Sequence, residues 1–253
     1  MTSYKEKLVI EIVNLTKKYQ LNQFNHKTFL IDIINLIGKK KSYNKNEIKA
    51  LDNISLNIYE GEKIAVLGKN GSGKTTLMRV LSRITKPTNG EVILRQSITT
   101  SALQGAFAFQ SELSALDNIY QFCAIKGLNR RKTNDILGDI IEFAECSKFI
   151  NTPIKRFSSG MSMKLALSIS IHIPGNIMIF DEIFNYIDKS FKAKVINYIS
   201  SKLYKNRNTL LLVSHDEDLL RKLCDKAIVL ENGKLMFSGK LQEALKIYQS
   251  TYN

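Results

Sequence analysis

The chain has 253 residues, of which 44% are hydrophobic, enough for one large α/β domain or two small ones with a sizeable core. Its N-terminus lacks the apolar segment of a secretory signal, no apolar run approaches the roughly 20 residues of a membrane-spanning helix, and the cysteines have neither disulfide-framework nor metal-ligand spacing, so we expect a cytosolic or peripheral protein. The formal net charge of +14 would attract nucleic acid, an anionic membrane surface or a nucleotide, and does not distinguish between them.

The chain begins with a predicted strand at residues 8–13, followed by a long detour that ends before Ala50. Within the detour, the apolar residues of 29–37 recur at helical spacing, and a basic, asparagine-rich loop follows at 38–45. An apolar helix beside lysines fits a membrane surface or a membrane subunit. The same helix could equally pack on its own domain, and both interpretations remain open.

A phosphate-binding loop is predicted at residues 68–75, with the sequence Gly-Lys-Asn-Gly-Ser-Gly-Lys-Thr. It follows the apolar strand 63–67 and precedes a helical pattern, which is the context such a loop needs. The glycines let backbone amides surround a polyphosphate, and the helix N-terminus adds partial positive charge. Lys74 would reach the β- and γ-phosphates, and the Thr75 hydroxyl would bind Mg²⁺. The predicted nucleotide-binding residues of this loop are Gly68, Asn70, Gly71, Ser72, Gly73, Lys74, Thr75 and Thr76.

Helical patterns dominate from about residue 116 to 172, and apolar strands return at 177–180 and 209–213. Short apolar strands separated by helices predict a buried parallel sheet with crossover helices. We therefore expect a helical subdomain inserted into an α/β core. The predicted organisation is a single domain over 1–253, with a core of 1–110 and 173–253 and a helical subdomain of 111–172.

Two adjacent acids, Asp181 and Glu182, end the apolar strand 177–180. In a phosphate-loop protein, an acid at this strand end holds Mg²⁺ directly or through water. A second acid beside it can orient and deprotonate the attacking water. Alone, such a pair would more often be two solvated surface acids, but its position after a Lys74-Thr75 loop favours the catalytic interpretation.

The segment Phe157-Ser158-Ser159-Gly160-Met161 opens a predicted helix and resembles the signature motif of the ABC-transporter ATPases. Its Ser-Ser-Gly-Met form is similar to the signature motif of the subfamily that exports bacterial surface polysaccharides and teichoic acids. The resemblance implies an ABC-type P-loop NTPase, an α/β fold with a mainly parallel core sheet, an antiparallel β part and an inserted helical subdomain. It also implies a head-to-tail dimer, in which the signature binds the γ-phosphate of nucleotide held by the second copy.

Other motif positions of the family can be placed on this sequence. Gln110 resembles the residue that senses Mg²⁺ and the attacking water, and His215 the switch histidine that holds the catalytic acid. Asp188 resembles the acid of the dimer-contacting loop, although the three residues before it depart from the usual pattern. Tyr19 resembles the aromatic that stacks on adenine, with a core tyrosine as the alternative. The implied roles are catalysis by Glu182, His215, Gln110 and Lys74, ATP contacts by Tyr19, Ser158, Ser159, Gly160 and Asp188, and Mg²⁺ binding by Thr75, Gln110 and Asp181.

We therefore expect an ATPase that uses ATP and Mg²⁺ to power export of a lipid-linked surface polysaccharide or related polymer across the bacterial cytoplasmic membrane. The expected partners are a second copy of the chain and integral permease subunits, without nucleic acid. The protein would lie on the cytoplasmic face of the membrane, and residues 29–45 would be a further contact with the membrane or the permease. The alternatives are the ATPase of a general drug or lipid exporter and a soluble ABC ATPase that acts on ribosomes or DNA.

Overall fold

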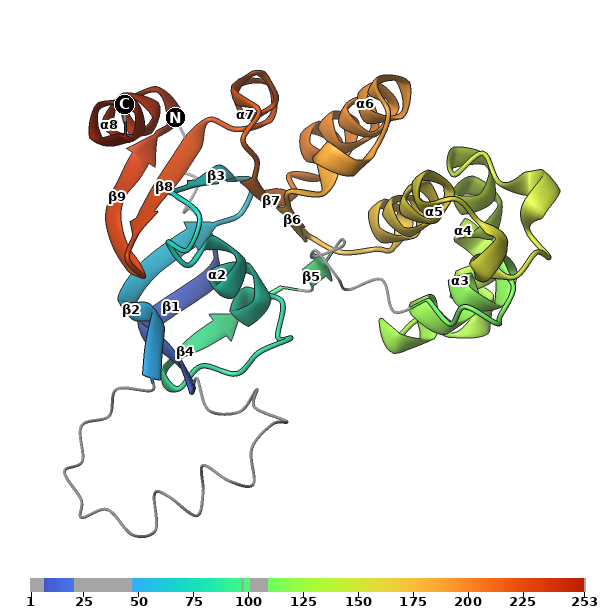
Figure 1. Ribbon diagram of the computed structural model, residues 1–253, viewed down its shortest axis with the longest axis horizontal. Coiled ribbons are helices and arrows are strands. Elements are labelled where there is room, and N and C mark those ends of the chain that lie inside the picture. The colour runs from blue at the N-terminus through green and yellow to red at the C-terminus, as the bar shows by residue number, and fades with distance from the viewer. Residues whose placement is uncertain (1–6, 21–46, 97, 101–108, 253) are drawn as a thin grey trace, which may run out of the picture.

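The computed structural model describes residues 7–20, 47–96, 98–100 and 109–252 (Figure 1). The helix expected at 29–37 and the basic loop at 38–45 lie outside this part of the chain. The described residues form two β-sheets with helices packed around them, and a helical subdomain to one side (Figure 1). Within these residues, no helix combines the length and apolar character needed to cross a bilayer.

The antiparallel sheet has the strand order β2-β1-β4, with β1 at Leu8–Gln20, β2 at Glu47–Tyr59 and β4 at Asn89–Leu94. β1 is longer than the predicted strand 8–13, because its pairing with β2 continues to Gln20 opposite Glu47. Irregular pairs interrupt the register, and Asn14 there has a φ of +48°. This extension places Ile48 of β2 opposite Tyr19 in the candidate site.

The larger sheet has the strand order β5-β6-β7-β3-β8-β9, and β9 alone among these strands runs antiparallel to its neighbour. The mainly parallel core sheet and the separate antiparallel part are therefore confirmed. The strand bounds are β3 Lys63–Leu67, β5 Ile98–Thr100, β6 Ile177–Asp181, β7 Thr209–Val213, β8 Lys226–Glu231 and β9 Lys234–Lys240.

The central strands are almost continuously apolar because both faces of the sheet are covered. In β6, Ile177 and Ile179 join the cluster formed with the antiparallel sheet and α2 (Lys74–Leu81). Met178 and Phe180 point into the opposite cluster, formed with the helices on the other face. Those helices are α6 at Lys189–Asn206, α7 at Glu217–Leu223 and α8 at Leu241–Tyr252.

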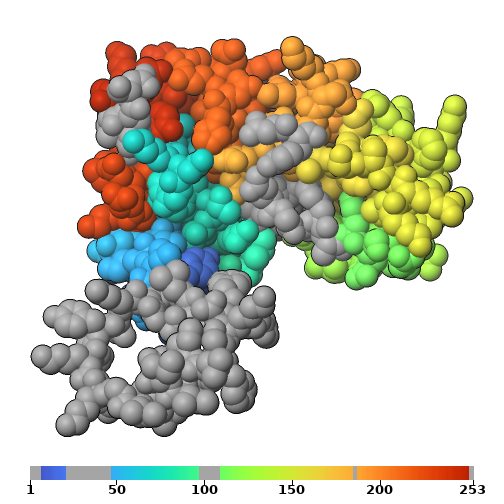
Figure 2. Space-filling view, viewed as in Figure 1, coloured from blue at the N-terminus to red at the C-terminus, as the bar shows by residue number. Residues whose placement is uncertain are grey.

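The helical subdomain contains α3 (Ala115–Ile125), α4 (Arg130–Phe143) and α5 (Ser159–His172), with short 3₁₀ turns at Ser147–Phe149 and Ile154–Arg156. A further 3₁₀ turn, Ile183–Tyr186, follows β6 in the core. Figure 2 shows the subdomain as a lobe beside α6. We propose residues 111–172 as its extent.

Side-chain caps account for where these helices begin. Ser114 accepts a hydrogen bond from the Asp117 amide, and Asn129 accepts one from the Lys132 amide. The Asn129 cap starts α4 at Arg130, because a capping side chain rather than the apolar pattern sets the first turn.

Candidate functional site

The phosphate-binding loop connects β3 to α2 and depends on two glycines. Gly68 and Gly73 have φ angles of +149° and +105°, which other residues rarely adopt. A Cβ at Gly68 would lie 2.4 Å from the Ser72 Oγ, and one at Gly73 would lie 2.5 Å from the Ala50 carbonyl oxygen. The loop can therefore pack against its neighbours only because these positions lack side chains.

A β-hairpin supports the loop from outside the predicted motif. The turn between β8 and β9 is Asn232-Gly233, and both residues have positive φ, as a type I′ turn requires. The Gly233 amide donates to the Ser72 carbonyl at 3.0 Å, and the Gly233 carbonyl accepts from the Asp52 amide at 2.8 Å. The hairpin thereby ties the phosphate-binding loop to β2.

Lys74 is the first residue of α2, and its side chain is largely buried. Its Nζ donates to the carbonyl oxygens of Gly68 at 2.7 Å and Lys69 at 2.9 Å. Burial lowers the pKa of the Lys74 ammonium, and the carboxylates of Glu182 and Asp181 oppose that shift. The ammonium is thus held over the loop, where it faces the two acids at the end of β6.

Asp181 is 1% exposed, and neither of its carboxylate oxygens has a hydrogen-bond partner among the residues that the structure describes. Burial raises its pKa most and Glu182 raises it further, while the nearby Thr75 hydroxyl and the positive charges of Lys74 and Arg79 lower it without cancelling the rise. A buried carboxylate without partners is costly unless a cation neutralises it. Carboxylate and hydroxyl oxygens are ligands that Mg²⁺ accepts, so Asp181 and Thr75 fit this ion.

Within the described ranges, no group of three histidine, cysteine or acidic side chains is arranged to hold a metal ion alone. Mg²⁺ typically takes one or two protein oxygens and completes its coordination with phosphate oxygens and water. The Asp181–Thr75 pair therefore fits a cation that arrives together with a polyphosphate.

Glu182 lies at the boundary between β6 and the following 3₁₀ turn with a φ of +55°, in the left-handed region. That conformation is uncommon for a residue with a long side chain, and such strain clusters at functional sites. The Glu182 amide donates to the Val213 carbonyl at 3.0 Å. Its Oε1 lies 3.1 Å from the His215 Nε2, so the ends of β6 and β7 bring together the predicted catalytic acid and histidine.

An open cavity of about 700 Å³ lies beside the phosphate-binding loop, a size suited to a nucleotide. It contains most of the predicted loop residues and also reaches β1, β2 and the β8–β9 turn. The lining residues are Tyr19, Ile48, Lys49, Ala50, Asn70, Gly71, Gly73, Lys74, Thr75, Thr76, Glu182 and Asn232.

Tyr19 and Ile48 form an apolar rim at one end of this cavity. The two residues pair across β1 and β2, and they are 38% and 51% exposed. The Lys17 ammonium lies 5.0 Å from the centroid of the Tyr19 ring. Tyr19 is therefore not a core tyrosine, and the cavity has an apolar end opposite its phosphate-binding end.

Sequence reasoning missed several lining residues. It treated the chain before Ala50 as a detour, whereas β2 already starts at Glu47 and so places Ile48 to Ala50 along the cavity. Asn232 could have been found, because an Asn-Gly pair between two apolar runs is a strong hairpin signal. What no local pattern indicates is that this hairpin packs against the phosphate-binding loop.

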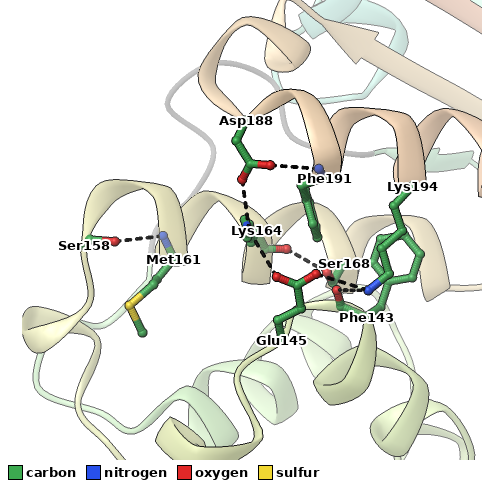
Figure 3. Close-up of polar contacts among 9 residues, drawn as sticks. All are labelled: Phe143, Glu145, Ser158, Met161, Lys164, Ser168, Asp188, Phe191 and Lys194. Atoms are coloured by element: carbon green, nitrogen blue, oxygen red, sulfur yellow. Dashed lines mark hydrogen bonds and ion pairs between the residues drawn. The ribbon is translucent and has the colours of Figure 1, made fainter.

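The signature residues do not line the cavity in the part of the chain that the structure describes. Ser158 and Ser159 are exposed, and Gly160 is partly exposed, at the start of α5. The Ser158 Oγ caps this helix by accepting from the Met161 amide at 3.2 Å (Figure 3). Asp188 is also exposed and caps α6 through the Phe191 amide at 2.9 Å.

Gln110 likewise lies away from the cavity lining, and its residue is exposed. Its amide donates to the Asn118 Oδ1 at 2.8 Å, and its carbonyl accepts from the Asn118 Nδ2 at 3.1 Å. Asn118 is 2% exposed and was not predicted from sequence. A buried asparagine therefore fixes the backbone where the core gives way to the helical subdomain.

Comparison with known proteins agrees with this geometry. Residues 51–185 match the ABC transporter family. The chain is 32% identical over 244 residues to the teichoic acids export ATP-binding protein TagH of Staphylococcus epidermidis, covering 95% of this chain and 88% of that protein. It is 32% identical over 245 residues to the O-antigen export system ATP-binding protein RfbB of Klebsiella pneumoniae, covering 95% and 97%.

A solved dimeric structure of the ATP-binding cassette MJ0796 bound to ADP and Pi has the same fold. Its TM-score is 0.72, with 22% identity and coverage of 92% of this chain and 98% of that one. The protein described here belongs to the ABC transporter family of ATPases. The fold class and the family predicted from the signature are therefore confirmed.

We expect Tyr19→Ala to weaken ATP binding by roughly 5- to 150-fold, since stacking of a base on an aromatic ring contributes about 1–3 kcal/mol. Calorimetric titration of the full chain measures this change. Tyr19→Phe should bind like the wild type because the ring remains, and Tyr204→Ala, at an 84% exposed position on α6, is the matched control. Equal affinities of Tyr19→Ala and wild type would remove Tyr19 from this role.

Replacing Asp181 by Asn should leave the melting temperature of the ligand-free protein unchanged or higher, because an unpaired buried charge is removed. Its raised pKa means that the folded state binds the proton more tightly. The stability of the wild type relative to Asp181→Asn should therefore fall as pH rises from 3.8 through the raised pKa.

The same variant should lose the additional thermal stabilisation that Mg²⁺ gives to the ATP complex. Melting curves with ATP, in Mg²⁺ or in a chelator, measure this difference. Asp135→Asn, at an exposed site on α4, should behave as wild type. A variant that still gains stability from Mg²⁺ would contradict the assignment of Asp181.

Proposed function

We propose that this chain is the ATPase subunit of an exporter for a lipid-linked surface polysaccharide or a related polymer. The observation that supports this most directly is the convergence of the phosphate-binding loop, Asp181, Glu182 and His215 at one sheet edge. The polymer class is inferred from the relatives, since the two described above are named for teichoic acids export and O-antigen export.

The residues at this edge have complementary roles in ATP hydrolysis. Lys74 and the loop amides neutralise the charge of the phosphates, most strongly where charge develops on the transferred phosphoryl group. Glu182 accepts the proton of the attacking water, and His215 holds the Glu182 carboxylate at the 3.1 Å contact. The water oxygen forms a bond to the γ-phosphorus, while the bond between the γ-phosphorus and the β–γ bridging oxygen breaks. The products are ADP and phosphate.

Asp181 and Thr75 are the residues that would hold Mg²⁺, and Gln110 is a third proposed contact. When bound, the ion supplies positive charge to the β- and γ-phosphate oxygens. Since Gln110 does not line the cavity in the described structure, we propose that it reaches the nucleotide when the segment connecting core and helical subdomain moves toward the phosphate-binding loop.

The second half of each site is proposed to come from another copy of the chain. Ser158, Ser159 and Gly160 are accessible at the N-terminus of α5, where backbone amides and the helix dipole favour an anion. Since they do not line the cavity beside Lys74, they can bind a γ-phosphate held by a second, head-to-tail copy. The similar cassette MJ0796 is dimeric in both solved structures.

We expect Glu182→Gln to retain ATP binding and to lower turnover by about 100-fold or more, because an amide cannot accept the proton of water. Phosphate release and ATP affinity should be measured on the same preparation. Glu142→Gln, at an exposed site on α4, is the matched control and should match the wild type. Unchanged turnover in Glu182→Gln would exclude this residue as the catalytic base.

The transport role predicts that the chain is recovered with membranes only when an integral permease subunit is co-expressed. Recovery that survives a wash at high ionic strength indicates docking to the permease. Recovery that the wash abolishes indicates adsorption by the +14 charge, since salt screens exposed charges. Specific recovery with ribosomes or DNA would contradict the exporter assignment.

A further inference from the structure

The helix that begins at the signature carries a lysine that contacts acids from two other segments. The Lys164 Nζ, in the second turn of α5, lies 3.0 Å from the Asp188 Oδ2 and 3.1 Å from the Glu145 Oε2 (Figure 3). Asp188 begins α6 in the core, and Glu145 follows α4 in the helical subdomain. One ammonium group therefore joins three segments.

Both carboxylate oxygens of Asp188 have a partner. Its Oδ1 accepts the Phe191 amide and caps α6, while its Oδ2 receives Lys164. The Phe191 amide and then the Lys164 ammonium lower the pKa of Asp188, and the hydrogen bond to Asp188 contributes most to the raised pKa of Lys164. Both groups therefore remain charged at neutral pH, and the start of α6 is bound to α5.

A second lysine reinforces the same junction. The Lys194 Nζ of α6 donates to the Phe143 carbonyl at 3.0 Å and lies 3.6 Å from the Glu145 Oε1. It also lies 4.6 Å from the centroid of the Phe143 ring. Without Lys164, Glu145 would keep only this longer ion pair among the described residues, and Asp188 would keep only its capping bond.

A second aspartate that both caps a helix and pairs with a lysine occurs at the start of α7. Asp216 caps α7 through the Leu219 amide at 3.0 Å and receives the Lys192 Nζ of α6 at 2.6 Å. Asp216 directly follows His215, which contacts Glu182. Helix α6 is therefore fixed by a lysine–aspartate pair to the signature helix on one side and to the His215 segment on the other.

We propose that Lys164 is a positioning residue that fixes the signature segment relative to the catalytic edge by bridging Asp188 and Glu145. This inference depends on the proposed function, in which Ser158 to Gly160 complete the site of a second copy. Lys164 is not one of the described residues that line the nucleotide cavity. Its loss should therefore slow turnover without weakening the binding of ATP to the chain's own loop.

The test compares three variants of the full-length chain. Lys164→Met should lower turnover by roughly 10- to 100-fold, the cost of a small misplacement of reacting groups. Its affinity for ATP should stay within about twofold of the wild type. Lys164→Arg keeps a cation that can reach both carboxylates and should restore most of the turnover.

Lys155→Met is the matched control. Lys155 pairs with Glu112, and the two residues belong to the same subdomain, so this pair spans no junction. Its loss should change turnover and affinity by less than about twofold. The proposal would be overturned if Lys164→Arg were as slow as Lys164→Met, if ATP affinity fell in proportion to turnover, or if the control were equally slow.

Amide hydrogen exchange tests the positioning itself without requiring activity. Lys164→Met should accelerate exchange in peptides covering residues 157–163 and 185–191, and Lys164→Arg should not. Unchanged exchange in Lys164→Met would contradict the proposal. If exchange is unchanged but the wild-type chain hydrolyses ATP and the Glu182→Gln variant does not, the proposed function still stands. A wild-type chain without turnover would instead contradict the proposed function, while exchange would still decide whether Lys164 fixes the junction.

Discussion

The parallel alignment of β3, β6 and β7 is the constraint on which the rest of the site depends. The carboxyl ends of these neighbouring strands face the same edge of the sheet, so the segments that follow them meet there. These segments are the phosphate-binding loop, the acid pair 181–182 and the segment containing His215. Alternate side chains of each strand join hydrophobic clusters on opposite faces, and this packing fixes the alignment.

The same edge holds two buried charges that the fold itself does not fully neutralise. Within the described part of the chain, both carboxylate oxygens of Asp181 lack hydrogen-bond partners, and Lys74 is bonded to neutral carbonyl groups. Burying such groups opposes folding, so their presence together indicates a site that is completed by other charges. A polyphosphate complements the lysine, and a divalent cation complements the acid.

Helix α5 connects this edge to the surface proposed to bind a second copy. Leu165 and Ile169 pack into the hydrophobic cluster of the helical subdomain, whereas Leu167 and Ile171 pack into that of the core. The helix is buried on both sides along its middle, while its N-terminal Ser158 remains accessible. The orientation of the signature is therefore coupled to how the subdomain packs on the core.

The sequence by itself determined the segments whose chemistry depends on local order: the loop 68–75, the acid pair 181–182 and the signature 158–160. Each is recognised from residue types and spacing along one short segment, together with its flanking apolar pattern. Only the tertiary structure decided which distant segments meet. Tyr19 lies beside Ile48 because β1 pairs with β2, and the β8–β9 hairpin supports the phosphate-binding loop from a much later part of the chain. Such contacts depend on strand register and on packing between remote elements, which the local pattern of neither element specifies.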